Sequence, residues 1–210
     1  MKRKNSRNTK GRIVSAAWKL FYQHGYENTT VDDIIYESGT SKGSFYHYFS
    51  GKDALLSSLS YLFDEKYDEL SEDLHRMGYL DQLIFLNREL FRMIEDTVSI
   101  DLLSRLLSSQ LVTKSEKHLL DHDRTYYKLL RSIISAGQEC GELREDVSVN
   151  DIVKAYAMYE RAIMYDWCLC GGDYSLCSYS SRMLPLLLRA YTTEAKDEER
   201  RRSERASRVQ

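Results

Sequence analysis

The residues best suited to chemistry lie between Thr30 and Lys52, in the segment TVDDIIYESGTSKGSFYHYFSGK. Lysine, histidine, serine and tyrosine side chains follow one another there, and such donors suit the phosphate oxygens and base edges of DNA. At about 100° per residue, Phe45 and Phe49 point to one side of a short helix, whereas Ser44 and His47 point to the other. The pattern predicts a helix that buries its phenylalanines and presents a polar, basic face to a duplex.

Local signals predict the elements that position this face. Thr30 is placed to cap a helix, and Asp33 completes a capping box with it. Gly39 ends that helix, and Ser41 caps the next one, over residues 42–49. Two short helices joined by a tight turn form a helix-turn-helix, whose second helix reads the major groove.

The predicted DNA-contacting residues share a position on this second helix or at the start of a flanking helix. They are Thr30, Ser41, Lys42, Gly43, Ser44, Tyr46, His47, Tyr48 and Lys52. We rank Lys42 first among them, and for Tyr48 core packing and DNA contact are equally open. Arg7 and Arg12 are expected to reach an adjacent groove or phosphate.

The charge distribution supports a nucleic-acid contact at one end of the chain. The formal net charge is -2, but residues 1–52 contain nine Lys and Arg against four Asp and Glu, a balance of +5. The remaining residues therefore carry -7. A basic head on an acidic body indicates that only the head meets a polyanion.

The composition predicts an all-α protein, because the 210 residues include one proline and no long alternating apolar run. We expect disorder over residues 1–9, a first helix over 10–24, and a long connecting helix that a Ser50–Asp53 capping box opens and that runs to Leu74. The further helices are expected over residues 80–97, 99–110, 116–139, 150–169 and 175–192. The predicted domains are a helix-turn-helix head (1–52), a helical effector-binding and dimerisation body (53–193) and a charged, disordered tail (194–210).

The helix over residues 150–169 is apolar almost all round, so both of its sides must be buried. One side can face its own core, and the other requires a partner. With the last helix it is expected to form a four-helix bundle in a homodimer. The predicted interface consists of Ile152, Tyr156, Ile163, Leu184, Leu187, Leu188 and Tyr191.

A pocket for a small-molecule effector is expected among large apolar side chains of the body. The candidates are Phe85, Phe91, Met93, Tyr126, Tyr159, Met164 and Trp167. Such residues at helical spacing also serve as ordinary core, and the sequence leaves both interpretations open.

Histidine and cysteine residues offer two further possibilities. His118 and His122 lie four positions apart on a predicted helix, which suits a metal pair, but a solvated polar face is the preferred interpretation, and we predict no metal and no cofactor. Cys170 and Cys177 flank a glycine loop and could form a disulfide. A thiol-redox regulator that uses Cys168, Cys170 or Cys177 is therefore the alternative function.

Several classes of protein are disfavoured. No apolar stretch reaches the ~20 residues that span a bilayer, and the basic amino end lacks the apolar core of a secretion signal. We expect a cytoplasmic protein without a membrane partner. It is not expected to be an enzyme, because no nucleophile–base motif, phosphate loop or strong metal signature is found. A regulator that acts through a protein partner stays open.

The segments FYQHGYENTTV and DDIIYESGTSKGSFYHYFSGKDAL resemble the TetR/AcrR-type transcriptional regulators, and the resemblance covers about residues 9–60. The residues that match the family's pattern are Thr30, Gly39, Ser41, Lys42, Gly43, Tyr46, Phe49, Lys52 and Leu55. The resemblance implies a homodimer with three-helix, homeodomain-like DNA-binding heads and a ligand-holding body. It further implies repression at a palindromic double-stranded operator, with release when a small molecule binds.

Overall fold

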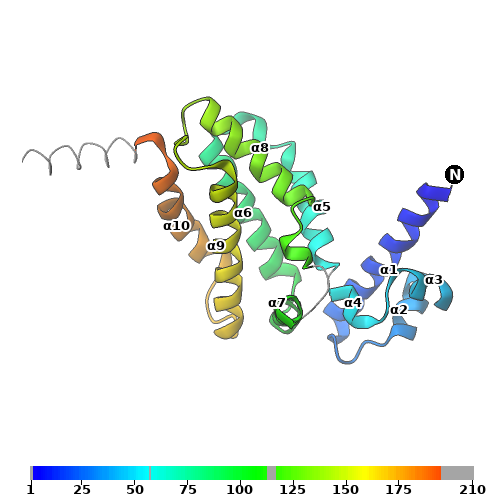
Figure 1. Ribbon diagram of the computed structural model, residues 1–210. Helices are drawn as coiled ribbons and strands as arrows, with labels where there is room; N and C mark the ends of the chain where they lie inside the picture. Colours follow the sequence, from blue (N-terminus) through cyan, green and yellow to red (C-terminus); the bar gives the residue numbers. More distant parts are fainter. Residues whose placement is uncertain (1, 57, 113–116, 195–210) are drawn as a thin grey trace, which may run out of the picture. The chain divides into compact units, whose positions relative to one another are not determined.

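The computed structural model describes residues 2–56, 58–112 and 117–194 (Figure 1). Every regular element among them is helical, and one isolated antiparallel bridge joins Leu143 to Thr192. The α-helices are α1 (Lys2–His24), α2 (Val31–Ser38), α3 (Lys42–Tyr48), α4 (Lys52–Leu56), α5 (Leu59–Ser71), α6 (Tyr79–Thr97), α7 (Ile100–Val112), α8 (Thr125–Glu139), α9 (Val149–Leu169) and α10 (Leu176–Leu188). The short 3₁₀ helices are η1 (Leu74–Arg76), η2 (His118–Leu120) and η3 (Arg189–Tyr191). The predicted all-α class is confirmed.

The chain divides into two compact units. The first comprises Met1–Leu62 and Asp96–Leu120, and the second comprises Phe63–Glu95 and Asp121–Gln210. The division differs from the predicted boundary after residue 52, because α7 belongs with the amino-terminal helices. In the first unit α1 packs on α2 and α3, while α4 packs on α7. This unit is called the head below, and the second is called the body.

The core of the head contains the apolar residues that the helical period selects. Ile13, Ala17, Ile34, Phe45 and Leu55 are each 0% exposed. The three-helix arrangement therefore places the inner face of α3 against α1 and α2 and leaves its outer face free of the core.

Two predicted helix boundaries in the head are wrong. Helix α1 begins at Lys2 instead of near residue 10. Its first residues are polar, so the spacing of apolar residues gives no signal for this part of the helix. The connecting helix is also interrupted, since α4 ends at Leu56 and α5 begins at Leu59. At the break, Ser58 Oγ donates to the Leu55 carbonyl (2.5 Å) and accepts from Trp18 Nε1 (3.0 Å), which competes with continued helix.

The predicted helix over residues 116–139 begins only at Thr125. Residues 113–116, like the predicted tail from 195 onward, lie outside the described part. Two body helices, α6 and α10, begin where a carboxylate from a distant position accepts from their free N–H groups. Glu142 accepts from the amides of Tyr79 and Leu80 (2.9 and 2.8 Å), and Glu95 accepts from those of Leu176 and Cys177 (both 2.9 Å). These caps satisfy helix-end donors and fix α6 and α10 within the body.

Candidate nucleic-acid interface and body core

The turn before α3 has the geometry that the sequence predicts. Thr30 and Asp33 form a reciprocal capping box, and their hydrogen bonds lower the pKa of the Asp33 carboxyl. Gly39 adopts φ +59°, a left-handed conformation that favours glycine. Arg12 donates from Nη2 to the carbonyls of Ser38 (2.5 Å) and Gly39 (2.8 Å). Arg12 therefore clamps the turn from α1, which differs from the predicted groove contact. The side chain of Arg7 lies outside the described part.

Helix α3 divides its side chains as predicted. Ser41 Oγ accepts from the amide of Ser44 (3.1 Å) and caps the helix. Phe45 and Phe49 are buried at 0% and 6% exposure, whereas Tyr46 is 49% exposed. Ser41, Lys42, Gly43 and His47 are exposed too, while Ser44 and Tyr48 are half-buried. The exposed part of α3, namely Lys42, Gly43, Tyr46 and His47, is called the reading face below.

Two contacts hold side chains of this region in place without covering them. Lys42 Nζ lies 3.6 Å from Asp32 Oδ1, and both side chains are well exposed. The rings of His47 and Tyr48 meet edge to face at 4.7 Å. Thr30 is exposed at the start of α2. The reading face is thus open to solvent and follows a turn that is capped and hydrogen-bonded to Arg12.

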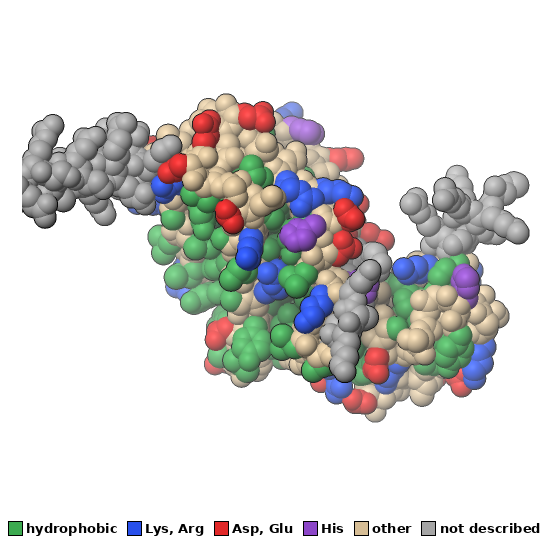
Figure 2. Space-filling view, viewed as in Figure 1, with side chains coloured by type: hydrophobic (Ala, Val, Ile, Leu, Met, Phe, Trp, Pro, Cys, Tyr) green, Lys and Arg blue, Asp and Glu red, His purple; other side chains and the backbone are tan. Residues whose placement is uncertain are grey.

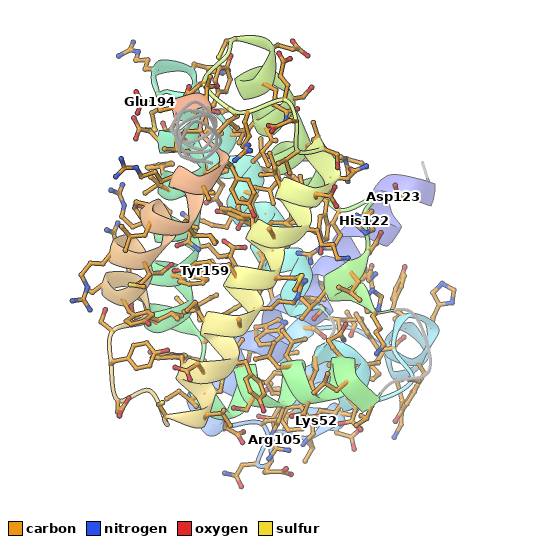
Figure 3. The ribbon with its side chains drawn as sticks, turned by 60° about the vertical axis from the view of Figure 1, so that its left-hand side comes forward. Lys52, Arg105, His122, Asp123, Tyr159 and Glu194 are labelled. Carbon is orange, nitrogen blue, oxygen red and sulfur yellow. The ribbon has the colours of Figure 1, made fainter. Side chains whose placement is uncertain are left out.

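Lys52 takes part in a cluster that the sequence did not reveal. Its Nζ donates to the Tyr26 carbonyl (2.7 Å) and lies 4.2 Å from the centre of the Tyr26 ring. The guanidinium of Arg105, from α7, lies 5.1 Å from the same ring and forms an ion pair with Glu27 (2.7 Å). The Tyr26 hydroxyl donates to Asp53. Figure 3 shows Lys52 and Arg105 close together at the lower edge of that view. This Tyr26 cluster ties α4 and α7 to the turn between α1 and α2.

The residues predicted for an effector pocket all belong to the body core or its edge. Phe91, Tyr126, Met164 and Trp167 are buried, whereas Phe85, Met93 and Tyr159 are half-buried. A cleft of about 500 Å³ lies elsewhere, between α1 and α2 of the head. Its lining residues are Gly11, Arg12, Ser15, Ala16, Lys19, Glu37 and Ser38, so it includes none of the seven.

A buried carboxylate lies among the predicted aromatic residues. Glu160 of α9 is 2% exposed, and its oxygens accept from Asn87 Nδ2 of α6 (2.9 Å) and from the Tyr126 hydroxyl of α8 (2.7 Å). Asn87 in turn accepts from Ser180 Oγ of α10 (2.6 Å), which also contacts the Tyr159 hydroxyl (3.2 Å). Figure 3 shows Tyr159 between α9 and α10. Burial raises the pKa of the Glu160 carboxyl. An apolar-pattern search passes over a glutamate at such a position, and no signal in the sequence marked it.

The structure places much of the predicted dimer interface inside the protomer. Ile152, Tyr156 and Leu184 are 0% exposed, and Leu188 is 1% exposed. Ile163, Leu187 and Tyr191 are half-buried. The buried residues serve the body's own core, so a partner would have to contact other side chains of the same helices.

Exposed apolar residues on α9 and α10 form such a surface. We call it the α9–α10 apolar face, and it consists of Met158, Ala162, Tyr165, Leu169, Met183 and Leu186. The α9 members recur at helical spacing, so they form a continuous stripe. Leu169 and Leu186 are 68% and 66% exposed, and exposed apolar residues gathered in one patch are a feature of interaction surfaces in general. Hydrophobic side chains gather over these helices in Figure 2.

The histidine and cysteine possibilities receive no structural support. His118 lies in η2 and His122 in the turn after it, so they do not occupy one regular helix. Among the residues that the structure describes, no group of three or more potential ligands could hold a metal. Cys170 and Cys177 are free thiols, and partial desolvation of the exposed Cys170, with the charges of nearby Asp166 and Asp173, raises the pKa of its thiol. A raised pKa disfavours the reactive thiolate.

No helix in the described part of the chain is both long and apolar enough to cross a membrane.

A capped turn followed by a short helix with an exposed basic and aromatic face is the arrangement of a helix-turn-helix DNA-binding protein. The family model for bacterial regulatory proteins of the tetR family matches residues 13–59. The HTH-type transcriptional repressor AcnR of Corynebacterium efficiens is 30% identical over 146 residues, which cover 68% of this chain and 72% of that protein. This chain belongs to the TetR family.

Two further similarities differ in their extent. An uncharacterized HTH-type transcriptional regulator of Lactococcus lactis is 48% identical over 48 residues, so the match spans only 24% of its length and 23% of this chain. The crystal structure of the transcriptional regulator FadR from Bacillus subtilis, in complex with stearoyl-CoA, has a TM-score of 0.65 at 20% identity. It covers 85% of this chain and 97% of that one, which establishes a shared fold along most of the chain.

Proposed function

We propose that this protein binds double-stranded DNA as a homodimer and represses transcription from a near-palindromic operator until a small-molecule effector, bound in the body, releases it. The observation that carries the DNA-binding part is the exposed reading face on α3. Lys42 and Tyr46 project from a helix whose phenylalanines anchor it in the head. In a twofold dimer, two such helices would enter successive major grooves about 34 Å apart.

Selection of bound duplexes from a random library, followed by fluorescence anisotropy, tests this part. The expected consensus is an inverted repeat. Lys42→Ala and Tyr46→Ala should each weaken binding by about 1–3 kcal/mol, or roughly 5- to 150-fold. Lys19→Ala and Tyr22→Ala are matched controls, because Lys19 also forms an exposed ion pair and Tyr22 is 64% exposed outside α3. Equal losses in test and control variants would contradict the reading face.

The homodimer part rests on the α9–α10 apolar face. A carboxylate buried there without a partner costs about 3–5 kcal/mol. Leu186→Asp should therefore dissociate the dimer and weaken operator binding by more than 100-fold. Leu111→Asp is the control, since Leu111 is 71% exposed on α7 of the head. A Leu186→Asp dimer that persists at micromolar concentration in sedimentation would refute this interface.

The release step rests on a comparison of folds. FadR, which shares this architecture, was crystallised with stearoyl-CoA. The shared fold and the polar network buried around Glu160 support a small-molecule site in the body. Loss of operator binding when a compound binds the body would support this step, and a protein partner that causes the loss instead would contradict it.

A further inference from the structure

The carboxylate of Glu160 lies in the body without a countercharge. It is 2% exposed, and its hydrogen-bond donors are neutral: Asn87 and Tyr126, together with the Tyr156 hydroxyl, which also acts on the carboxyl. Within the described residues, no Lys or Arg side chain forms an ion pair with it. Arg161 acts on it only from a distance, and its Nη1 donates to the Tyr127 hydroxyl (3.3 Å). An ionised carboxyl group without a partner is costly there, so burial favours its protonated form until a cation arrives to pair with the carboxylate.

Arg124, the nearby cation that could have compensated Glu160, already forms an ion pair with another carboxylate. Arg124 forms a two-pronged ion pair with Asp64 (2.9 and 3.1 Å), and both side chains are largely buried. That pair is neutral as a whole. Among the described residues, the body core therefore contains one compensated ion pair and, beside it, one carboxyl group with which no Lys or Arg forms an ion pair.

A second polar group in the same part of the core lacks a hydrogen-bond partner among the described residues. The hydroxyl of Tyr67, on α5, is buried and has no hydrogen-bond partner among the described residues. Its ring lies 5.1 Å from that of Tyr126, and the charge of Glu160 contributes to its raised pKa, after burial. A buried hydroxyl without a partner costs about 1–3 kcal/mol, so an arriving polar ligand would gain by satisfying it.

The aromatic surroundings favour a positive charge. Tyr126, Tyr156 and Tyr67 come from three helices and lie within electrostatic reach of Glu160. The rings already accept a cation, because the Arg124 guanidinium lies 5.8 Å from the centre of the Tyr126 ring. Faces of aromatic rings attract ammonium groups, and a carboxylate at their centre adds direct charge pairing.

We propose that Glu160, together with Tyr67, Tyr126 and Tyr156, recognises an effector that carries an organic ammonium group. This proposal rests on the proposed function, since it names the ligand class for the same body site. The ammonium would lie against the Glu160 carboxylate, and an adjoining hydrogen-bonding group would reach the Tyr67 hydroxyl. An acyl chain without a positive charge would leave both groups uncompensated.

The test compares ammonium ions with neutral molecules of the same shape, in the full-length protein without DNA. The probes are benzyltrimethylammonium and naphthylmethyltrimethylammonium, each with the isostere in which carbon replaces nitrogen. Equilibrium dialysis should show at least a tenfold preference for the ammonium form. Glu160→Gln should reduce that preference about tenfold, whereas Glu139→Gln, at an exposed position in the same unit, should leave it unchanged.

A role for Glu160 in packing alone would reduce the binding of ammonium and neutral probes equally, and this result would overturn the proposal. Failure of both ammonium ions to bind would overturn it as well. Operator release is measured separately by anisotropy. Selective binding without release would retain the ammonium site but refute its role as the effector site. A protein that binds ammonium ions but no DNA would refute the proposed function alone.

Discussion

Substitution of Gly39 by alanine should destabilise the head more than the same change at Gly25, although both glycines have positive φ. The angles are +59° at Gly39 and +79° at Gly25. Either alanine costs about 1–2 kcal/mol in a left-handed conformation. A Cβ at Gly25 would meet nothing within 4 Å, whereas one at Gly39 would lie 2.8 Å from Arg12 Nη2. Gly39 therefore leaves room for the Arg12 side chain in addition to adopting a left-handed backbone conformation.

The size of the difference follows from what Arg12 does. Its Nη2 donates to two carbonyls at the end of α2, and an alanine would displace it from both. A hydrogen bond from a charged donor contributes about 1.5–3 kcal/mol when it is buried. Because Arg12 is exposed, we expect its two hydrogen bonds to contribute about 1 kcal/mol together. We expect Gly39→Ala to lower the free energy of unfolding by about 2–3 kcal/mol and Gly25→Ala by about 1–2 kcal/mol.

Urea denaturation can measure the difference in the free energy of unfolding between Gly39→Ala and Gly25→Ala in the head alone. Trp18 is in the head and Trp167 in the body, so a Trp167→Phe background leaves Trp18 as the reporter. In a double-mutant cycle with Arg12→Ala, the losses should fall short of additivity by about 1 kcal/mol, since the clash and the bonds disappear together. Equal losses at the two glycines, or additive losses with Arg12→Ala, would refute the assigned role of Arg12.

Three further predictions concern other parts of the molecule. The raised pKa of Glu160 means that the native state holds its proton at a pH at which the unfolded chain has released it. The free energy of unfolding of the wild type should therefore fall with rising pH relative to that of Glu160→Gln. The slope should reach up to about 1.4 kcal/mol per pH unit above about pH 4.5. A stability difference that is constant between pH 5 and pH 8 would contradict this. Tyr26→Phe removes the donor to Asp53 but retains the ring beneath Lys52 and Arg105. The free energy of unfolding in denaturant titrations should fall by about 1–2 kcal/mol. An unchanged midpoint would argue against the hydrogen bond. Peroxide should leave operator affinity unchanged, since Cys170 and Cys177 are separate thiols, and a loss of affinity that serine replacements abolish would restore the redox alternative.

Short-range signals explain why so much of the head could be predicted. A capping box acts over three residues, a left-handed glycine acts at its own position, and a helical face repeats within four residues. Thr30, Gly39, Ser41 and Phe45 therefore occupy the structural positions that their spacing predicts. The burial of Phe45, together with the exposure of Lys42, follows from one helix whose two faces differ in chemistry.

The Tyr26 cluster and the Glu160 network depend on partners that are far apart in the sequence. Asn87 and Glu160 are 73 positions apart, and Lys52 is 26 positions from the Tyr26 carbonyl that it contacts. No local period relates such residues. Their contacts form only when whole helices pack, so the sequence pattern predicts only a DNA contact for Lys52 and assigns no role to Glu160.

Helix α9 shows most clearly how far a sequence pattern can predict packing. Its sequence is apolar almost all round, which establishes that two sides need burial, but the two sides look alike in the pattern. Packing in the body buries Ile152 and Tyr156 and leaves Met158 and Leu169 exposed. The sequence by itself thus determined that the chain is helical, where its turn and reading helix lie, and that α9 has more apolar surface than one core can cover. Only the tertiary structure decided which side of α9 is covered, because that choice depends on the shape and polarity of helices that arrive from elsewhere in the chain.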